Sequence, residues 1–318
     1  MRSSWLSSIP ELASIPGPIH LAIGVFDGVH LGHRAVLERA LREARQQGGN
    51  AVAVTFDPHP ARVLRPEKAP HLLTSTAHKI RLIREIGIKH ILVQPFTREF
   101  ADTEPAQFIR DLVAVCQLRE ICVGHEWCFG KDRAGNLALM AELGKQLGFD
   151  EVGVPAVQVD GEVVSSTVIR RSIEAGELAK AGRLLGRPYA ILGTVVRGQQ
   201  LGRKLGFPTA NVAAHNEQFP PNGVYAVRVR GDRTGGEEWK GVANIGVRPT
   251  IANSAGERLL EVHLLDFSSE IYGDDIEVTF TRFLRPEQKF PSLDALKEQI
   301  ASDAAEARQV PLNREAFQ

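Results

Sequence analysis

The chain contains little cysteine and no long apolar run, which excludes several classes of protein. Its 318 residues contain three cysteines, Cys116, Cys122 and Cys128, and none of them forms a CxxC pair. This small odd number argues against a disulfide framework and a cysteine zinc site, and it is typical of reduced thiols in the cytoplasm. No window holds the ~20 apolar residues that a membrane-spanning helix needs, so we expect no membrane partner. The N-terminal segment has three prolines and no continuous apolar core, which argues against a signal peptide.

The chain also lacks an excess of charge of either sign. Its 38 basic and 38 acidic side chains give a formal net charge of +0. Proteins that hold a nucleic-acid backbone usually carry a basic excess, so we expect no nucleic-acid partner. The balanced net charge does not exclude small anionic ligands, because a binding site for them needs only local positive charge. The sequence leaves the oligomeric state open.

The first ~185 residues alternate between short apolar runs and helical patterns, as parallel sheets with crossover helices do. A chain of this length accommodates two domains. We expect strands at 20–26, 51–56, 90–96, 119–124 and 151–159, and helices within 31–47, 74–87, 102–116 and 137–147.

After Tyr189 the pattern changes to successive strand-like runs, which suggests an antiparallel barrel or sandwich. These runs are 189–198, 223–231, 239–246, 259–267 and 275–284, and the next helical pattern begins at Ser292. We therefore expect one domain over residues 1–186 and a second over residues 187–318.

The stretch "GVFDGVHLGH" follows the first predicted strand and opens the first predicted helix. Open α/β sheets bind ligands at the carboxyl ends of their strands. Gly24 and Gly32 let the backbone approach a phosphate, and the helix N-terminus attracts anions. His30 and His33 lie on one side of the first turn and can donate hydrogen bonds to phosphoryl oxygens, while Asp27 can orient one of them. The alternative is a surface loop with two histidines.

A second anion-binding pattern is "SSTVIRRSIEAG", which begins at Ser165. Ser166 and Thr167 supply hydroxyls at a helix start, and Arg170 adds a charge that pairs with phosphate. A plain helix cap with solvent-exposed arginines is the alternative. Two helix N-termini of this kind favour a triphosphate between them.

The segment "RGQQLGRKLGFPTAN" places Thr209 and Asn211 one residue apart. In an extended chain their side chains point the same way. A hydroxyl and an amide oxygen are ligands that suit Mg²⁺ held together with substrate phosphates. The segment is not a Walker A loop, so a kinase built on it has another design. A Gly-Pro turn with a local cap is the alternative.

These motifs occur together in one known family of proteins, which the chain resembles. With "VTFDPHPARVL", "VGHEWCFGKDRAGN", "GVANIGVRPT" and "EVHLLDFSSEIYG", the chain resembles the prokaryotic bifunctional FAD synthetases over roughly residues 18–310. These enzymes combine riboflavin kinase with FMN adenylyltransferase. The resemblance implies a Rossmann-like nucleotidyltransferase domain with a parallel sheet, then a six-stranded β-barrel with a helix on its outside. It implies ATP, riboflavin, FMN and FAD as ligands and Mg²⁺ as the cofactor.

The resemblance also assigns expected site residues. His30 and His33 would contact the phosphates of ATP as catalytic groups. We expect nucleotide contacts from Gly24, Phe26, Asp27, Gly32, Ser166, Thr167, Arg170, Gly198, Arg203 and Gly206. We expect flavin contacts from Asp57, Pro58, His59 and Phe129.

Glu261, in the strand-like run "LLEVHLLDF", faces either solvent or a site. Phosphorylating the primary alcohol of riboflavin benefits from a general base, whereas the phosphate of FMN is already ionised at neutral pH. By resemblance to riboflavin kinases, Glu261 is that base, and Thr209 and Asn211 hold the metal.

One loop departs from the family pattern. Glu126 and Trp127 stand where the family has Asp or Asn followed by Phe, and Asp132 replaces a glycine. Two other functions stay open on sequence alone. One is a nucleotidyltransferase for a different phosphorylated substrate, and the other is a flavin-binding regulatory protein with one or both sites inactive.

Overall fold

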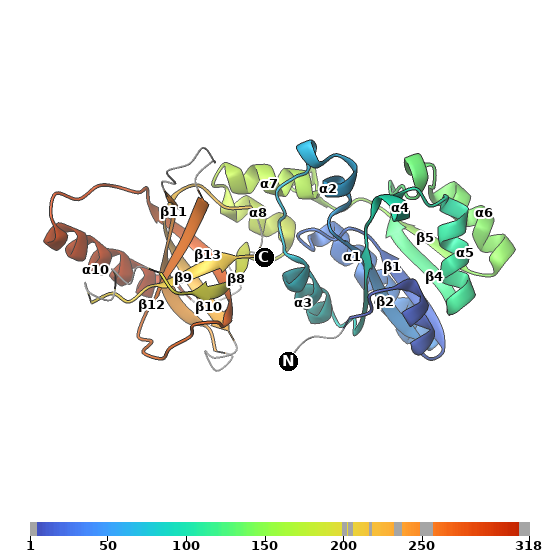
Figure 1. Cartoon of the computed structure of the whole chain (residues 1–318), viewed down its shortest axis with the longest axis horizontal. Coiled ribbons are helices and arrows are strands. Elements are labelled where there is room, and N and C mark those ends of the chain that lie inside the picture. The colour runs from blue at the N-terminus through green and yellow to red at the C-terminus, as the bar shows by residue number, and fades with distance from the viewer. Residues whose placement is uncertain are drawn as a thin grey trace. The chain divides into compact units, whose positions relative to one another are not determined.

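The computed structural model describes residues 5–198, 202, 206–215, 218–231, 237–248 and 257–311. The chain divides into two compact units. The first, called here the sheet unit, comprises residues 1–70 and 76–166, and the second, the barrel unit, comprises residues 71–75 and 167–318. Figure 1 labels their elements.

The sheet unit is built on five parallel strands in the order β3-β2-β1-β4-β5. The chain order reverses at β1, so the loop after β1 lies at the crevice where such sheets bind ligands. The strands are β1 (Pro18–Ile23), β2 (Asn50–Asp57), β3 (His90–Pro95), β4 (Gln117–Gly124) and β5 (Asp150–Val154). The helices and turns are η1 (Ile9–Ser14), α1 (Leu31–Gln47), α2 (Pro60–Leu64), η2 (Pro66–Lys68), α3 (Thr76–Ile86), α4 (Arg98–Ala101), α5 (Pro105–Val115), η3 (Lys131–Arg133) and α6 (Leu137–Leu147).

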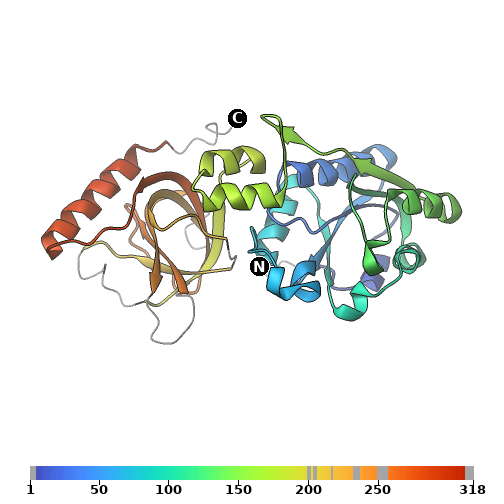
Figure 2. The ribbon, with the colours of Figure 1, turned by 90° about the horizontal axis from the view of Figure 1, so that it is seen from above.

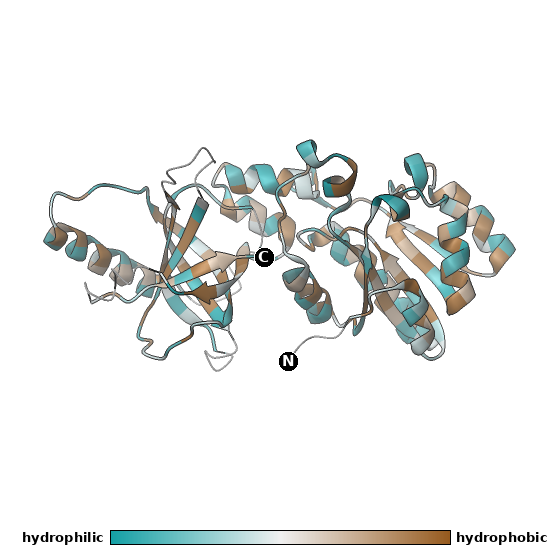
Figure 3. Ribbon diagram, viewed as in Figure 1, coloured by the Kyte–Doolittle hydropathy of each residue, from teal (hydrophilic) through white to brown (hydrophobic). Residues whose placement is uncertain are grey.

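Both faces of this sheet are buried, because alternate residues of each strand join different cores. Ile19, Leu21 and Ile23 of β1 pack with the apolar side chains of α5 and α6. Ala22 of the same strand packs with those of α1 and α3. Figure 3 shows the result as hydrophobic strands beneath helices that are hydrophobic on one side and hydrophilic on the other.

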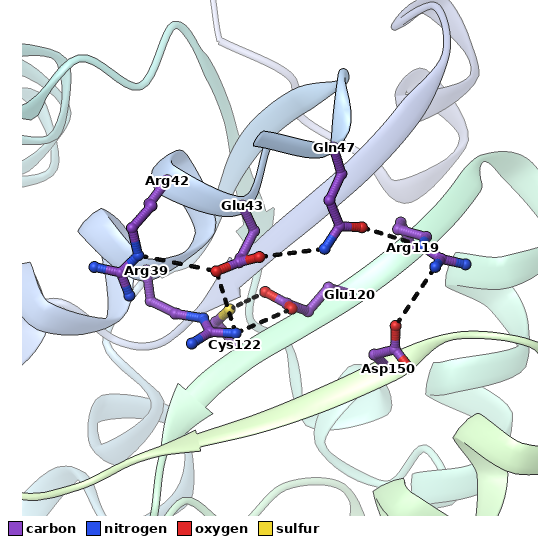
Figure 4. Close-up of polar contacts among 8 residues, drawn as sticks. All are labelled: Arg39, Arg42, Glu43, Gln47, Arg119, Glu120, Cys122 and Asp150. Carbon is purple, nitrogen blue, oxygen red and sulfur yellow. Dashed lines mark hydrogen bonds and ion pairs between the residues drawn. The ribbon is translucent and has the colours of Figure 1, made fainter. Parts of the chain in front are cut away.

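A polar cluster lies between α1 and β4 (Figure 4), and Glu43, Glu120 and Cys122 are its buried members. Arg39 contacts Glu43 over 3.2 Å and Glu120 over 3.7 Å, and the thiol of Cys122 donates to Glu120 over 2.9 Å. Burial raises the pKa of the Cys122 thiol, so this cysteine stays protonated and unreactive. On β1, His20 is the Cα partner of Glu120 and is fully buried.

The last strand of the sheet is shorter than the sequence predicts. β5 ends at Val154 because Pro155 follows, and proline has no N–H for the sheet ladder. The rest of the predicted run forms β6 (Gln158–Val159), which pairs with β7 (Glu162–Val163) in a separate hairpin.

The barrel unit is a closed antiparallel barrel of six strands in the order β10-β11-β12-β9-β8-β13. The expected fold class is thereby confirmed. The strands are β8 (Ala190–Val196), β9 (Ala210–Ala214), β10 (Gly223–Gly231), β11 (Trp239–Arg248), β12 (Glu257–Leu264) and β13 (Asp275–Arg285). The helices are α7 (Ser166–Glu174), α8 (Leu178–Leu185) and α10 (Leu293–Gln309). Figure 2 shows α10 along the outside of the barrel, where its buried alanines pack against β10 and β11.

The periodicity of the sequence does not reveal β9. Its five residues, Ala210–Ala214, include only one β-branched side chain, Val212. Its pairing with β8 and β12 comes from barrel closure rather than from local propensity.

A short segment from the first half of the chain belongs to the barrel unit. Gln218 N donates to Leu72 O over 3.0 Å, and Tyr189 Oη donates to Leu73 O over 3.5 Å. Arg170 Nε on α7 donates to His71 O over 2.6 Å. Residues 71–75 are therefore held by hydrogen bonds that no local pattern predicts.

Candidate active sites

The loop between β1 and α1 presents the histidine pair at the start of α1. His30 is the N-cap residue, and its Nδ1 accepts a hydrogen bond from the His33 backbone N–H over 3.3 Å. The two imidazole rings stack with centroids 3.5 Å apart and an interplanar angle of 18°. His30 is buried and His33 half-buried. The structure thus brings together the two residues that the sequence predicts to act on phosphate.

Phe26 and Gly24 give this loop its shape. Phe26 has a positive φ of 52°, which turns its ring back over Gly24, and a Cβ at Gly24 would lie 2.7 Å from that ring. The same ring packs edge-on against His33, with centroids 5.4 Å apart. A Cβ at Gly32 would lie 3.2 Å from the His30 ring. Both glycines therefore leave room for the aromatic rings of the loop.

The anion-binding pattern that begins at Ser165 adds one side chain to this loop. Ser166 Oγ donates to the Asp27 backbone oxygen over 2.9 Å, and the Asp27 side chain is buried. Thr167 and Arg170 follow on α7, in the barrel unit. Their contact with ATP stays a prediction.

One charged residue near the histidine loop, Lys79, belongs to no motif of the sequence. Lys79 on α3 is only 5% exposed, and its Nζ donates to Val25 O over 3.1 Å and Phe56 O over 3.2 Å. Burial lowers the pKa of Lys79 to about 8, against the opposing charges of Asp27 and Asp57. The available clue is that Lys79 occupies the apolar stripe of a helix, where lysine is rare.

The residues expected to bind flavin lie after β2 and after β4. Asp57 ends β2, Pro58 follows it, and His59 caps α2 by accepting the Ala61 backbone N–H over 3.1 Å. Phe129 is buried and stacks on Trp127 with ring centroids 4.6 Å apart.

A continuous row of aromatic rings joins the two places, with centroids between 5.8 and 6.1 Å apart at successive contacts, namely Phe56–Phe100, Phe100–Phe108 and Phe108–Phe129. Phe56, Phe108 and Phe129 belong to the hydrophobic core of the sheet unit, and Phe100 packs against it.

The barrel unit contains a cavity of about 400 Å³ with an acidic and an apolar part. Glu261 lines it together with Thr209, Asn244 and His263. Its apolar lining includes Val224, Val242, Phe290, Leu296 and Ile300. Glu261 thus lines a cavity, and its role as general base stays a prediction.

Neighbouring strands place Glu261 between two amides. Asn211 on β9 and Asn244 on β11 are its Cα partners on either side. Directly opposed residues in antiparallel strands point to the same face, with Cβ atoms about 5 Å apart. Sequence analysis did not single out Asn244, which lies 17 residues before Glu261 and becomes its neighbour only through the β11–β12 register.

A second cavity of about 340 Å³ shares Thr209 with the first. It is lined by Pro208, Thr209, Phe267, Ser268 and Tyr272 among others. Thr209 is thus the residue at which the two cavities meet.

Two glycines explain how the expected metal ligands are packed. A Cβ at Gly198 would overlap the Asn211 amide, and a Cβ at Gly202 would lie 3.1 Å from Thr209 Oγ1. Gly206 has a positive φ of 87°, a conformation that favours glycine. Arg203 lies outside the described residues. Gly198 therefore leaves space for the Asn211 amide, whereas a Cβ at Gly202 would first overlap the Phe207 backbone oxygen.

Within the described residues, His, Cys, Asp and Glu form no group of three that could hold a metal by themselves. Thr209 and Asn211 nevertheless suit an ion that takes most of its ligands from water and phosphate, as Mg²⁺ does. None of the helices in the described part of the chain is long and apolar enough to cross a membrane.

Family comparisons match both units in chain order. The family described as FAD synthetase matches residues 13–168, and the family described as riboflavin kinase matches residues 185–311. Curated relatives named bifunctional riboflavin kinase/FMN adenylyltransferase match nearly the whole chain. The relative from Escherichia coli strain K12 is 42% identical over 290 residues, which are 91% of each chain. The relative from Listeria monocytogenes is 36% identical over 290 residues, again 91% of each chain.

A solved structure also matches over most of its length. It is described as a macrolide-efflux protein from Streptococcus pneumoniae and has 29% sequence identity with this chain and a TM-score of 0.77. The match covers 93% of this chain and 96% of that one.

Proposed function

This chain belongs to the family of bifunctional riboflavin kinases/FMN adenylyltransferases, and from this we propose that its barrel unit converts riboflavin to FMN and its sheet unit converts FMN to FAD. ATP is the second substrate of both reactions. The observation that best supports the roles proposed for individual residues is that Glu261 and Thr209 line the same cavity.

In the barrel unit, the larger cavity takes riboflavin, because its apolar lining suits a flavin ring and Glu261 lies within it. The smaller cavity takes ATP, so that the phosphates lie at Thr209, which lines both. Glu261 accepts the proton of the ribityl alcohol as its oxygen bonds to the γ-phosphorus, and ADP leaves.

Thr209 Oγ1 and the Asn211 side-chain oxygen would hold Mg²⁺ with the phosphates of ATP. Bound there, the ion would neutralise phosphate charge. The chain's own contribution is to orient these two oxygens, and Gly198 leaves the space that the Asn211 amide occupies.

In the sheet unit, a phosphate oxygen of FMN attacks the α-phosphorus of ATP, and pyrophosphate leaves. FMN needs no general base, so His30 and His33 act by positioning and by stabilising charge. Because His30 Nδ1 accepts the His33 backbone N–H, a neutral His30 ring carries its proton on Nε2. This makes Nε2–H the donor toward a phosphoryl oxygen. Ser166 binds the same triphosphate, and the loop Asp57–His59 with Phe129 binds the flavin.

Incubating the purified chain with riboflavin, ATP and Mg²⁺, and then separating the flavins, tests both assignments. We expect FMN followed by FAD, and no product in the presence of a chelator. FMN without FAD contradicts the function of the sheet unit. A chain that binds flavin without forming either product is the regulatory protein considered above, which no observation here favours.

A further inference from the structure

Lys79 joins two loops that come from different strands of the sheet. Its Nζ donates to Val25 O, at the start of the histidine loop, and to Phe56 O, at the end of β2 beside Asp57. Thr55 Oγ1 also donates to Val25 O, over 2.9 Å. A single ammonium group thus connects the loop that carries the histidine pair with the loop Asp57–His59.

The Lys79 ammonium is buried, and this burial opposes its charge. It is packed inside the sheet unit beside Ile80 and Ile83, where an unpaired charge would be strongly unfavourable. The charges of two carboxylates partly offset this burial, Asp27 in the β1–α1 loop and Asp57 at the end of β2. Removing the positive charge would leave these carboxylates to repel each other and the phosphates that the site must admit.

We propose that Lys79 is a positioning residue for adenylyl transfer, whose charged ammonium holds the β1–α1 and β2–α2 loops in one arrangement and balances Asp27 and Asp57. This inference rests on the proposed function of the sheet unit. Lys79 acts through the loops and their carboxylates, so it sets where the histidine pair and the flavin loop stand relative to each other.

If the charge of Lys79 matters, FMN adenylylation should depend on pH near the pKa of Lys79. A purely structural role of this side chain would not produce that pH dependence. Burial lowers its pKa to about 8, so the ammonium is charged at pH 7 and mostly neutral at pH 9. The pH dependence of kcat/KM reports groups of the free enzyme. We therefore expect kcat/KM for FMN adenylylation to fall about tenfold between pH 7 and pH 9. Riboflavin phosphorylation, in the other unit, should show no such step.

The experiment measures both reactions in the same full-length preparation, with FMN supplied for one and riboflavin for the other. In Lys79→Met, adenylylation at pH 7 should fall at least tenfold and lose its step near pH 8, while phosphorylation stays unchanged. Lys79→Arg keeps the charge at all these pH values and should remove the step while retaining more activity than Lys79→Met. Lys145→Met, the same change at an exposed lysine on α6, is the matched control.

The outcomes separate this inference from the proposed function. A wild-type chain that makes no FAD overturns the proposed function and this inference with it. A wild-type chain that makes FAD overturns only the inference if Lys79→Met is equally active or if the wild-type profile is flat from pH 7 to pH 9. Should Lys79→Met fail to fold, the wild-type profile still decides.

Discussion

At the scale of single residues, the two histidines of the β1–α1 loop do different work. His30 closes the first turn of α1 with its Nδ1, whereas the His33 side chain has no part in that cap. We therefore expect a change at His30 to alter both the stability of α1 and the proposed adenylyl transfer. We expect a change at His33 to alter mainly the proposed adenylyl transfer.

We expect His33→Ala to lower FMN adenylylation about 10²–10³-fold, because it removes one donor to developing phosphate charge. FMN formation from riboflavin should stay unchanged. Assays of each reaction with its own substrate supplied test this. His30→Ala should show a similar loss together with about 1 kcal/mol lower stability, and His30→Asn should restore the stability because asparagine also caps helices. Loss of FMN formation in a folded His33→Ala protein would refute the division of labour between units.

We expect Glu261→Gln to show the opposite selectivity. The amide cannot accept the proton of the ribityl alcohol, so riboflavin phosphorylation should fall about 10²–10⁴-fold. Adenylylation of supplied FMN should be retained. Glu298→Gln, at an exposed position on α10, is the control. If Glu261→Gln phosphorylates riboflavin as fast as the wild type, Glu261 is not the general base.

At the scale of elements, buried strands and tight turns contain residues that oppose stability. His20 of β1 is fully buried, and neither ring nitrogen has a hydrogen-bond partner among the described residues. The turn η3 includes Asp132 with a positive φ of 52°. Substitutions at His20 and at Asp132 can therefore be tested by their effect on the free energy of unfolding, without an activity assay.

His20 should make the chain less stable as the pH falls. Burial lowers the pKa of His20, against the opposing charge of Glu120. Below the ordinary histidine pKa, the unfolded chain therefore takes up a proton that the folded chain resists. We expect a loss of up to about 1.4 kcal/mol per pH unit from this group, and His20→Leu should abolish it. Urea unfolding of wild type and variant from pH 7.5 to 5.5 measures the difference. An unchanged difference across this range would contradict the prediction, and His125→Leu, at an exposed position, is the control.

Asp132→Gly should stabilise the sheet unit by about 0.5–1 kcal/mol, because glycine adopts a positive φ without steric cost. Lys131→Gly, in the same turn but without a positive φ, should have the opposite sign. Denaturant midpoints compare the two variants. Equal effects of the two substitutions would exclude backbone strain as the cause.

At the scale of the whole molecule, each unit holds the residues assigned to one reaction within its own fold, apart from Thr167 and Arg170. Neither Glu261 nor Thr209 comes from the sheet unit, and neither His30 nor His33 comes from the barrel unit. The product of the first reaction is the substrate of the second, so FMN released from one molecule can serve another.

A mixture of His33→Ala and Glu261→Gln proteins should therefore convert riboflavin to FAD, although neither variant does so at the wild-type rate alone. FAD formed over time in the mixture, compared with each variant separately, measures this. If each variant retains its single activity and the mixture makes no FAD, FMN does not pass between molecules.

Local patterns were sufficient for much of the fold. The helices 31–47 and 137–147 have the predicted bounds, because their apolar spacing and their capping residues His30 and Asn136 lie within a few residues of each other. Strand β9 and the end of β5 were not predicted, because barrel closure and Pro155 decide them. The domain boundary between residues 186 and 187 stays a prediction.

The sequence by itself determined the family, because its motifs occur in short stretches that can be recognised without a fold. It also predicts the histidine pair, Thr209 and Asn211 as site residues, and Glu261 by resemblance. Only the tertiary structure decided which residues support them. Asn244 meets Glu261 through the register of β11 and β12, and Lys79 reaches Val25 and Phe56 across 54 and 23 residues of chain. The physical reason is the distance in sequence over which each effect acts. Propensity and periodicity act over a few residues, whereas burial and charge compensation depend on side chains that come together only when the sheet and the barrel have formed.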